Sequence, residues 1–462
     1  MRSTEHEIGP GGTGPEETRG IDTRGTDTRG IDTRGIDTRV DVVVVGGGLA
    51  GLSAAVLAAG SGASVTLIDG GGLGGRARTT VKGGYRLNQG PRAVYLAGPA
   101  VALLRTMGIT LAGGPPPATA AHVVYQGEMH RMPASPALML RSRLMGVRQK
   151  ARLGVLFARL GRIDAASLAD RSGAQWLAEL ELGDAASALI ATLQRVSSYV
   201  AEPDRLSADI SVAQLRDAVT GPGVSYLDGG WQSLVDQLAA RAGQAEVSTV
   251  TSSAVRSIEA GPGGYRVVTD GGAWIGRALI MAVGSPKTTT RLLPSATAWT
   301  GLGPDVTAAC LDLGLATAPS PSAVFSMDDP LYLSTHCPPA DLAPPGGSVV
   351  HVMRNGARDG GLDQAELWRY AARAGIDEAD VVVHRFLPSM TVTHAIPGPE
   401  SGGLAGRPGV VVPELPGVFL AGDWVGAEGL LADASLASAR VAAAAAVAHV
   451  GHVGLTVSGG IR

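Results

Sequence analysis

Apolar residues are most concentrated between residues 40 and 69, where two apolar runs flank a stretch of small residues. Four consecutive valines at residues 42–45 predict a strand that is buried on both faces, as in a parallel sheet covered by helices. A helix is predicted next, because Leu52, Val56 and Ala59 form an apolar helical face. The second apolar run, residues 64–68, predicts another strand that ends on an acid, Asp69.

The turn after the first strand carries a G-x-G-x-x-G pattern, made by Gly46, Gly48 and Gly51. Glycines at these positions permit a tight turn, a close approach to a pyrophosphate and close packing of the helix on the sheet. The N–H groups of Leu49 and Ala50, at the start of the helix, then face the phosphates. Asp69 lies about 20 residues further on, where a carboxylate can accept a hydrogen bond from a ribose hydroxyl. We therefore predict a dinucleotide site; the alternatives are a structural glycine turn and an acid that only caps a turn.

Both chain ends are predicted to be tails, residues 1–39 and 451–462. Residues 18–39 repeat a five-residue unit, Thr-Arg-Gly-Ile-Asp with small variations. One isoleucine per unit buries too little surface to offset the entropy of ordering, so disorder or a misassigned start codon is expected. The N-terminus has no apolar core of a signal peptide, and we expect no apolar run of the ~18–20 residues that span a membrane.

Composition narrows the class of protein. The net charge of −3 gives no general attraction to nucleic acid. Cys310 and Cys337 are the only cysteines, and their spacing matches no metal site, so we expect no metal and a cytoplasmic, reducing compartment.

Residues 136–162 contain seven Lys and Arg residues among Leu, Met, Val and Phe. This pattern is typical of a basic amphipathic helix, which can contact an anionic membrane surface. The alternative, which we favour at this stage, is an ordinary helix pair with a charged face in solvent.

Further motifs carry a resemblance to a known family. Gly74-Gly75-Arg76 and a Gly90-Pro91 turn follow the nucleotide unit, and an apolar strand at residues 417–421 leads into Gly422-Asp423. In this order the motifs resemble those of the flavin amine oxidase, phytoene desaturase and protoporphyrinogen oxidase superfamily. One departure is Asp69, where members more often have Glu; either carboxylate can accept from the hydroxyls.

The resemblance implies FAD as the cofactor and assigns roles to residues. Asp69 would hold the adenosine ribose, Arg76 would lie by the cofactor, and Gly90 and Pro91 would border the isoalloxazine. The Val247 region would close around the adenine side. Asp423 would bond the ribityl chain, and the helix beginning near Leu431 would direct its N-terminus at the flavin, stabilising negative charge on the reduced ring.

The predicted fold class is α/β, with two interleaved domains. A Rossmann-like FAD-binding domain, a parallel sheet with helices on both faces, comprises residues 40–98, 222–290 and 409–450. An α+β substrate-binding domain comprises residues 99–221 and 291–408.

The predicted reaction is dehydrogenation or desaturation of a hydrophobic small molecule, isoprenoid-like or porphyrinogen-like, by hydride transfer to flavin N5. No second G-x-G-x-x-G follows a strand, so an external acceptor such as dioxygen or a quinone must reoxidise the flavin. His394 and Trp424 are the candidate substrate-facing residues. The oligomeric state is left open.

Two other functions stay open. Amine oxidases of the family commonly carry a lysine near flavin N5, whereas this chain has only Lys82, Lys150 and Lys287, none of them in the strand expected at residues 308–315. A non-catalytic carrier, like the prenyl-protein escort proteins that share this fold, is less expected because the flavin-contact motifs are intact.

Overall fold

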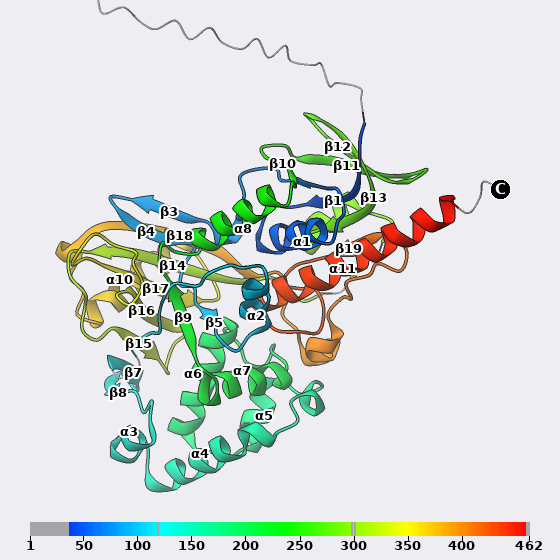
Figure 1. The fold of residues 1–462 in the computed structure, drawn as a ribbon. Helices are drawn as coiled ribbons and strands as arrows, with labels where there is room; N and C mark the ends of the chain where they lie inside the picture. The colour runs from blue at the N-terminus through cyan, green and yellow to red at the C-terminus, as the bar shows by residue number, and fades with distance from the viewer. Residues whose placement is uncertain (1–36, 118–119, 297–298, 300–301, 459–462) are drawn as a thin grey trace, which may run out of the picture.

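The computed structural model describes residues 37–117, 120–296, 299 and 302–458 (Figure 1). Most of the predicted N-terminal tail, residues 1–36, lies outside this described part. The first strand begins at Thr38, two residues before the predicted boundary at residue 40.

A seven-stranded, mostly parallel sheet forms the nucleotide half of the molecule. Its strand order is β10-β2-β1-β13-β12-β11. Strand β19 pairs with the carboxyl-terminal part of β13, beyond the part that pairs with β12. The strands are β1 Thr38–Val45, β2 Val65–Ile68, β10 Ser248–Val250, β11 Val255–Gly261, β12 Gly264–Thr269, β13 Gly272–Met281 and β19 Val418–Leu420. Strands β10, β2, β1, β13 and β19 pair in parallel, while β11 and β12 extend the sheet as antiparallel strands. The predicted α/β class with a Rossmann-like sheet is confirmed.

Helices α1 Leu49–Gly60, α8 Gln232–Gln244 and α11 Leu431–Ser458 pack beside one another on this sheet (Figure 1). Helix α11 also contacts α2 Pro99–Thr106. The apolar residues of α2 belong to the same core as the valines of β1, so α2 packs with the nucleotide half although the predicted boundary places it in the substrate domain.

Helix α11 differs from two expectations. It continues to Ser458, through most of the segment that was predicted to be a C-terminal tail. Its first 21 residues, Leu431–Gly451, have a mean hydropathy of 1.4 and are long and apolar enough to cross a membrane, so the expectation that no run reaches that length is wrong for this helix. Half of this segment is buried inside the protein, against α1, α2, β13 and β19, as in a core helix.

A second seven-stranded sheet, mostly antiparallel, has the order β18-β14-β17-β16-β15-β7-β8. Its strands are β7 Ala121–Tyr125, β8 Glu128–Arg131, β14 Val306–Leu315, β15 Ala323–Ser326, β16 Leu331–Cys337, β17 Ser348–Asn355 and β18 Val381–Thr393. Helix α10 Gly360–Arg373 packs on β14, β17 and β18. A helical layer lies below this sheet in Figure 1 and comprises α3 Pro136–Arg141, α4 Val147–Arg159, α5 Gly173–Glu179, α6 Asp184–Ser198 and α7 Ala208–Thr220.

Short elements join the two halves. They are the hairpin β3 Thr79–Lys82 and β4 Tyr85–Asn88, the small sheet of β5 Val94–Tyr95, β9 Val224–Leu227 and β6 Gly113–Gly114, and helix α9 Pro286–Leu292. The 3-10 helices are η1 Gly75–Ala77, η3 Leu160–Arg162, η4 Ala166–Leu168, η5 Glu378–Asp380, η6 Pro399–Ser401 and η7 Gly403–Gly406.

Candidate active site

A cavity of about 730 Å³ lies at the carboxyl ends of the parallel strands β1, β2, β13 and β19. This edge of an open α/β sheet is where such folds bind nucleotides. The cavity walls come from seven parts of the chain: residues 45–50, 68–92, 231, 254–255, 282–292, 387–394 and 422–435. Gly46 and Asp423 therefore line one cavity, as binding of one dinucleotide by motifs near both ends of the chain requires.

The glycines of the turn after β1 differ in how much space surrounds them. Gly46 has φ +107°, and a Cβ atom there would lie 2.3 Å from the Ala282 carbonyl oxygen. A Cβ atom on Gly51 would lie 1.8 Å from the Gly46 oxygen, so this glycine brings α1 close to the turn. A Cβ atom on Gly48 would meet no protein atom within 4 Å, and this residue lines the cavity.

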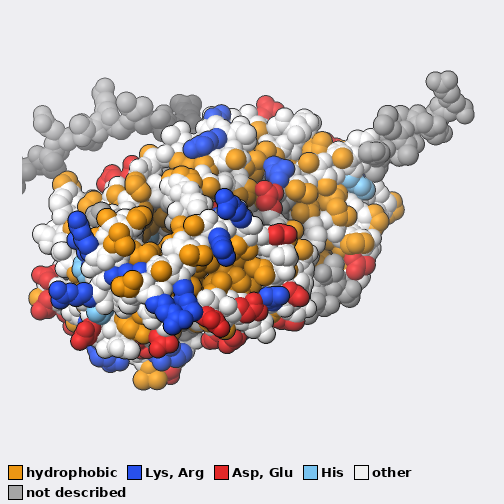
Figure 2. Space-filling model, turned by 90° about the horizontal axis from the view of Figure 1, so that it is seen from below, with side chains coloured by type: hydrophobic (Ala, Val, Ile, Leu, Met, Phe, Trp, Pro, Cys, Tyr) orange, Lys and Arg blue, Asp and Glu red, His pale blue; other side chains and the backbone are white. Residues whose placement is uncertain are grey.

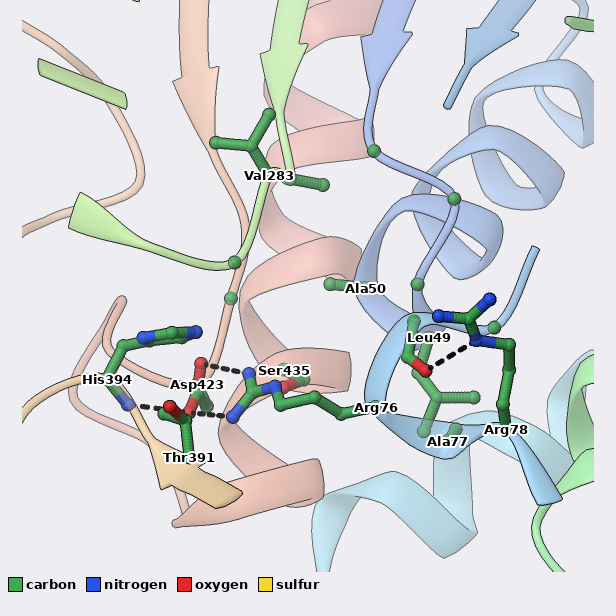
Figure 3. A pocket seen from close by; sticks show the side chains of 18 of the residues that line it. Leu49, Ala50, Arg76, Ala77, Arg78, Val283, Thr391, His394, Asp423 and Ser435 are labelled. Carbon is green, nitrogen blue, oxygen red and sulfur yellow. Dashed lines mark hydrogen bonds and ion pairs between the residues drawn. The ribbon is translucent and has the colours of Figure 1, made fainter. Parts of the chain in front are cut away.

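The N-terminus of α1 is open to the cavity. No side chain caps it, and Leu49 and Ala50 line the cavity wall (Figure 3). Unpaired N–H groups and the positive end of the helix dipole suit a phosphate group. An uncapped helix end beside a glycine with free space therefore fits the pyrophosphate of FAD.

Asp69 follows β2 and holds the glycine turn. Its Oδ2 accepts a hydrogen bond from the Gly47 N–H at 2.6 Å, and its Oδ1 accepts one from the Gly71 N–H at 2.8 Å. Asp69 also lines the cavity, and a carboxylate has about four acceptor positions. The turn-capping interpretation and the predicted ribose contact are thus compatible.

At the other end of the cavity, Arg76 of η1 forms a bidentate ion pair with Asp423. Its Nη2 donates to Oδ1 at 2.8 Å and its Nη1 donates to Oδ2 at 3.0 Å, and Nη1 also donates to the Val392 carbonyl oxygen at 2.8 Å. Burial would raise the pKa of Asp423, but the Arg76 guanidinium lowers that pKa to about 2. The pair joins η1 to the segment that follows β19 (Figure 3).

His394 lies next to this pair and faces the cavity (Figure 3). Its backbone N–H donates to Asp423 Oδ2 at 3.0 Å, and its ring Nδ1 lies 3.4 Å from Asp305 Oδ1. Burial and the positive charge of Arg76 lower the pKa of His394 below its usual 6.5, so the imidazole is neutral at pH 7. A substrate-facing role for His394 remains a prediction.

Two predicted site residues lie elsewhere. Trp424 is only 1% exposed; its indole Nε1 donates to the Gly284 carbonyl oxygen at 2.5 Å and its ring packs edge-on to Trp299. Its side chain is part of the core and does not line the cavity, so the prediction that it faces substrate is wrong. Val247 precedes β10 and therefore lies at the opposite edge of the sheet; the cavity is bordered instead by Ala254 and Val255, which follow β10.

All but one of the remaining predicted residues line one of two chambers. Gly75, Gly422 and Leu431 line the main cavity. Pro91 borders a smaller chamber of about 70 Å³, which shares Leu431 with the main cavity. Gly90 lines neither chamber. It has φ +72°, and a Cβ atom at this position would collide with the Met390 side chain.

Sequence reasoning did not assign a role to Arg92, which lines both chambers. Its Nε has no hydrogen-bond partner among the described residues although it is buried, and its guanidinium carbon lies 5.6 Å from the centre of the Trp231 ring. Burial and the neighbouring Arg76 charge lower the pKa of Arg92 to about 10, so the group stays positive at pH 7. Its place directly after Gly90-Pro91 was the available signal, but the lack of a partner for its Nε is visible only in three dimensions.

A second charged cluster lies outside the cavity, in the second sheet. Asp312 Oδ1 lies 2.6 Å from His351 Nδ1 and accepts from the Cys310 thiol at 3.2 Å, while Oδ2 accepts from Arg385 Nε at 2.8 Å. Cys310, Asp312 and His351 are buried and close enough to hold a metal ion. Arg385 already supplies the positive charge, however, and burial raises the pKa of the Cys310 thiol well above its usual value, so this cluster is equipped as an ion-pair network.

Comparisons with known proteins agree with this geometry. The family model described as flavin containing amine oxidoreductase matches residues 49–447. None of the curated proteins compared with the chain matches it.

Several solved structures share the fold. An oxidoreductase from Methanosarcina mazei has a TM-score of 0.69 at 15% identity, covering 87% of this chain and 99% of that one. A putative protoporphyrinogen oxidase from Exiguobacterium sp. 255-15 has a TM-score of 0.64 at 19% identity, covering 89% and 99%. Cyclohexylamine oxidase from Brevibacterium oxydans IH-35A has a TM-score of 0.66 at 16% identity, covering 90% and 99%. Because the family model spans most of the chain, this protein belongs to the flavin-containing amine oxidoreductase family and is an FAD-dependent oxidoreductase.

Proposed function

We propose that this enzyme dehydrogenates a hydrophobic small molecule that carries an anionic group, such as a porphyrinogen or an isoprenoid acid or phosphate. Bound FAD would accept the hydride at N5. The uncapped N-terminus of α1 would hold its pyrophosphate and the pair of Arg76 and Asp423 would lie along its other end. An external acceptor, dioxygen or a quinone, would complete the cycle.

The Arg92 guanidinium is the observation that carries the proposal. It lines both chambers, and its buried Nε lacks a partner among the described residues. A buried polar donor of this kind is costly unless a ligand pairs with it. A carboxylate or phosphate on the substrate would make that pair with the bidentate geometry that arginine favours. The apolar part of the substrate would contact Met390 and Val392, which line both chambers.

An amine substrate is less compatible with these walls. No lysine is among the described residues that line either chamber. A protonated amine would approach two guanidinium groups, Arg76 and Arg92, while Asp423 is already paired and Asp433 accepts from the N-terminus of α2 through Ala100 at 2.9 Å. The positive charges of Arg76 and Arg92 would repel the protonated amine and so oppose its binding.

His394 is the residue that we propose takes a proton. Desaturation removes a hydride and a proton from adjacent atoms, and a neutral imidazole can accept the proton. With Nδ1 directed at Asp305, Nε2 is the free acceptor, since the tautomer follows from the partner of the other nitrogen.

Anaerobic reduction of the protein-bound flavin tests the proposal. The purified protein should be yellow and release FAD on denaturation, and its visible absorbance should bleach with a porphyrinogen or an isoprenoid acid. Bleaching by cyclohexylamine or a diamine, with peroxide release in air, would instead favour an amine oxidase.

Arg92 offers a matched pair of variants. Arg92→Gln should raise KM for an anionic substrate by about tenfold to a hundredfold, the value of one charge-assisted pair, while FAD content stays unchanged. Arg92→Lys keeps the charge and should recover part of this loss. If the KM of both variants equals that of the wild type, Arg92 does not bind the substrate.

A further inference from the structure

Helices α3 and α4 and the short segment after them carry no carboxylate in their own sequence. Residues 136–163 contain seven Lys and Arg residues and no Asp or Glu. We propose that this α3–α4 surface, residues 136–162, docks on an anionic lipid bilayer.

An apolar stripe runs along the exposed side of α4. Val147, Ala151, Val155 and Ala158 are spaced by three or four residues and are all exposed, so they lie on one helical face. Val147 is 83% and Val155 is 51% exposed, and Leu140 of α3 is 76% exposed. Isolated exposed apolar residues need no explanation, but a row of them along one helix does.

The fold does not use this stripe. Helix α4 already buries a different face through Leu153 and Leu156, which join the core formed with α5, α6 and α7. The helix therefore has two apolar faces, and the outer one contacts no described element.

Arginines border the stripe and most have no protein partner. The side chains of Arg148 and Arg159 are exposed and, like those of Arg141, Arg143 and Arg162, make no hydrogen bond or ion pair within the described part of the chain. Arg152 contacts Glu181 at 3.8 Å, and Lys150 donates to the carbonyl oxygens of Leu140 and Ser142. Figure 2, which views the molecule from below Figure 1, shows basic side chains next to hydrophobic ones on the face of this helical layer.

Charge complementarity identifies the partner as a lipid surface. A bilayer with anionic headgroups offers a negative plane for five unpaired guanidinium groups and an apolar interior for Leu140, Val147 and Val155. Arginine side chains suit this position because their apolar stems extend along the membrane boundary while their charges stay at the headgroups.

Vesicle co-sedimentation of the full-length, FAD-bound protein tests the proposal. At low salt the protein should sediment with vesicles of phosphatidylcholine mixed with phosphatidylglycerol, and far less with phosphatidylcholine alone. High salt should release it, because exposed charges are screened.

Two variants address the two parts of the surface. The triple variant R148Q/R159Q/R162Q should lower partitioning to the mixed vesicles on the order of a hundredfold, and L140S/V147S/V155S should lower it at least about tenfold. Both variants change only exposed side chains, so flavin content and unfolding midpoint should match the wild type.

Matched controls carry the same substitutions elsewhere on the surface. R105Q/R369Q and L362S/V382S alter exposed residues of other elements and should bind vesicles as the wild type does. Absence of binding to the mixed vesicles at low salt would overturn the proposal, as would an equal loss in the controls. If the triple arginine variant instead lowers the mass of the protein in solution without vesicles, the surface is a contact between copies and not a membrane site.

Discussion

Two charged networks in this protein use the same residue types for different purposes. The cavity network joins Arg76, Asp423 and the backbone of His394, and it opens onto the cavity at the end of the nucleotide sheet. The sheet network joins Asp312, His351 and Arg385 inside the second sheet, where the Asp312 and His351 side chains are fully buried.

The networks differ in whether a charged group reaches the cavity. In the sheet network both Asp312 oxygens are occupied, and Arg385 also donates to the Asn88 backbone oxygen and to Thr80, so it ties β18 to the β3–β4 hairpin. In the cavity network, about a third of the Arg76 side chain is exposed to the cavity (34%). The sheet network is closed to the cavity and supports the structure, whereas the cavity network is open to the cavity and can accept a ligand.

The largest effect is expected from breaking the closed network. Asp312→Ala would leave the Arg385 and His351 side chains without their partner in a buried site. Removal of one partner of a buried ion pair costs about 3–5 kcal/mol of unfolding free energy. Urea denaturation would measure the loss, and a change under 1 kcal/mol would contradict the structural role.

Breaking the open network should affect the cofactor more than the fold. Asp423→Ala should lower the unfolding free energy by about 2 kcal/mol, because Arg76 regains water from the cavity. The ratio of bound flavin to protein should fall by tenfold or more. A variant with full flavin content would separate Asp423 from the cofactor site; Arg76→Gln provides an independent test of the same pair.

The pH dependence of stability should distinguish Asp423 in the wild type from its amide. The pKa of Asp423 is about 2 in the folded protein, below the ordinary 3.8. The carboxylate therefore contributes its ~2 kcal/mol above about pH 4, and this contribution is lost as the pH falls through 2. The difference in unfolding free energy between wild type and Asp423→Asn should shrink over that interval; a constant difference would show that the ion pair is not its source.

The smallest effect is expected from Cys310→Ala. The thiol is a weak donor to Asp312, so its removal should cost about 1 kcal/mol or less beyond a small cavity. Unfolding measurements and metal analysis of wild type and variant check this expectation. A metal present in the wild type and lost in the variant would show that the sheet network is a metal site.

The local sequence determined the first strand, the glycine turn and the first helix of the nucleotide half. The valines of β1 and the glycine turn encode steric requirements between near neighbours: Gly51 must approach Gly46, and Gly48 must leave space. Such constraints act over a few residues, so the pattern alone indicates the strand, the turn and the helix. The position of Asp69 at the end of the next strand follows in the same way.

Only the tertiary structure decided which distant side chains meet and which way they point. Arg76 and Asp423 pair across 347 residues, Trp424 turns into the core beside Asp423, and Val247 lies at the wrong edge of the sheet because it precedes β10. Arg92 follows the Gly90-Pro91 turn in the sequence, but the lack of a partner for its Nε among the described residues depends on the packing of both halves. The reason is physical: backbone patterns are set by local sterics and periodicity, whereas side-chain pairing and burial depend on which surfaces the whole chain brings together.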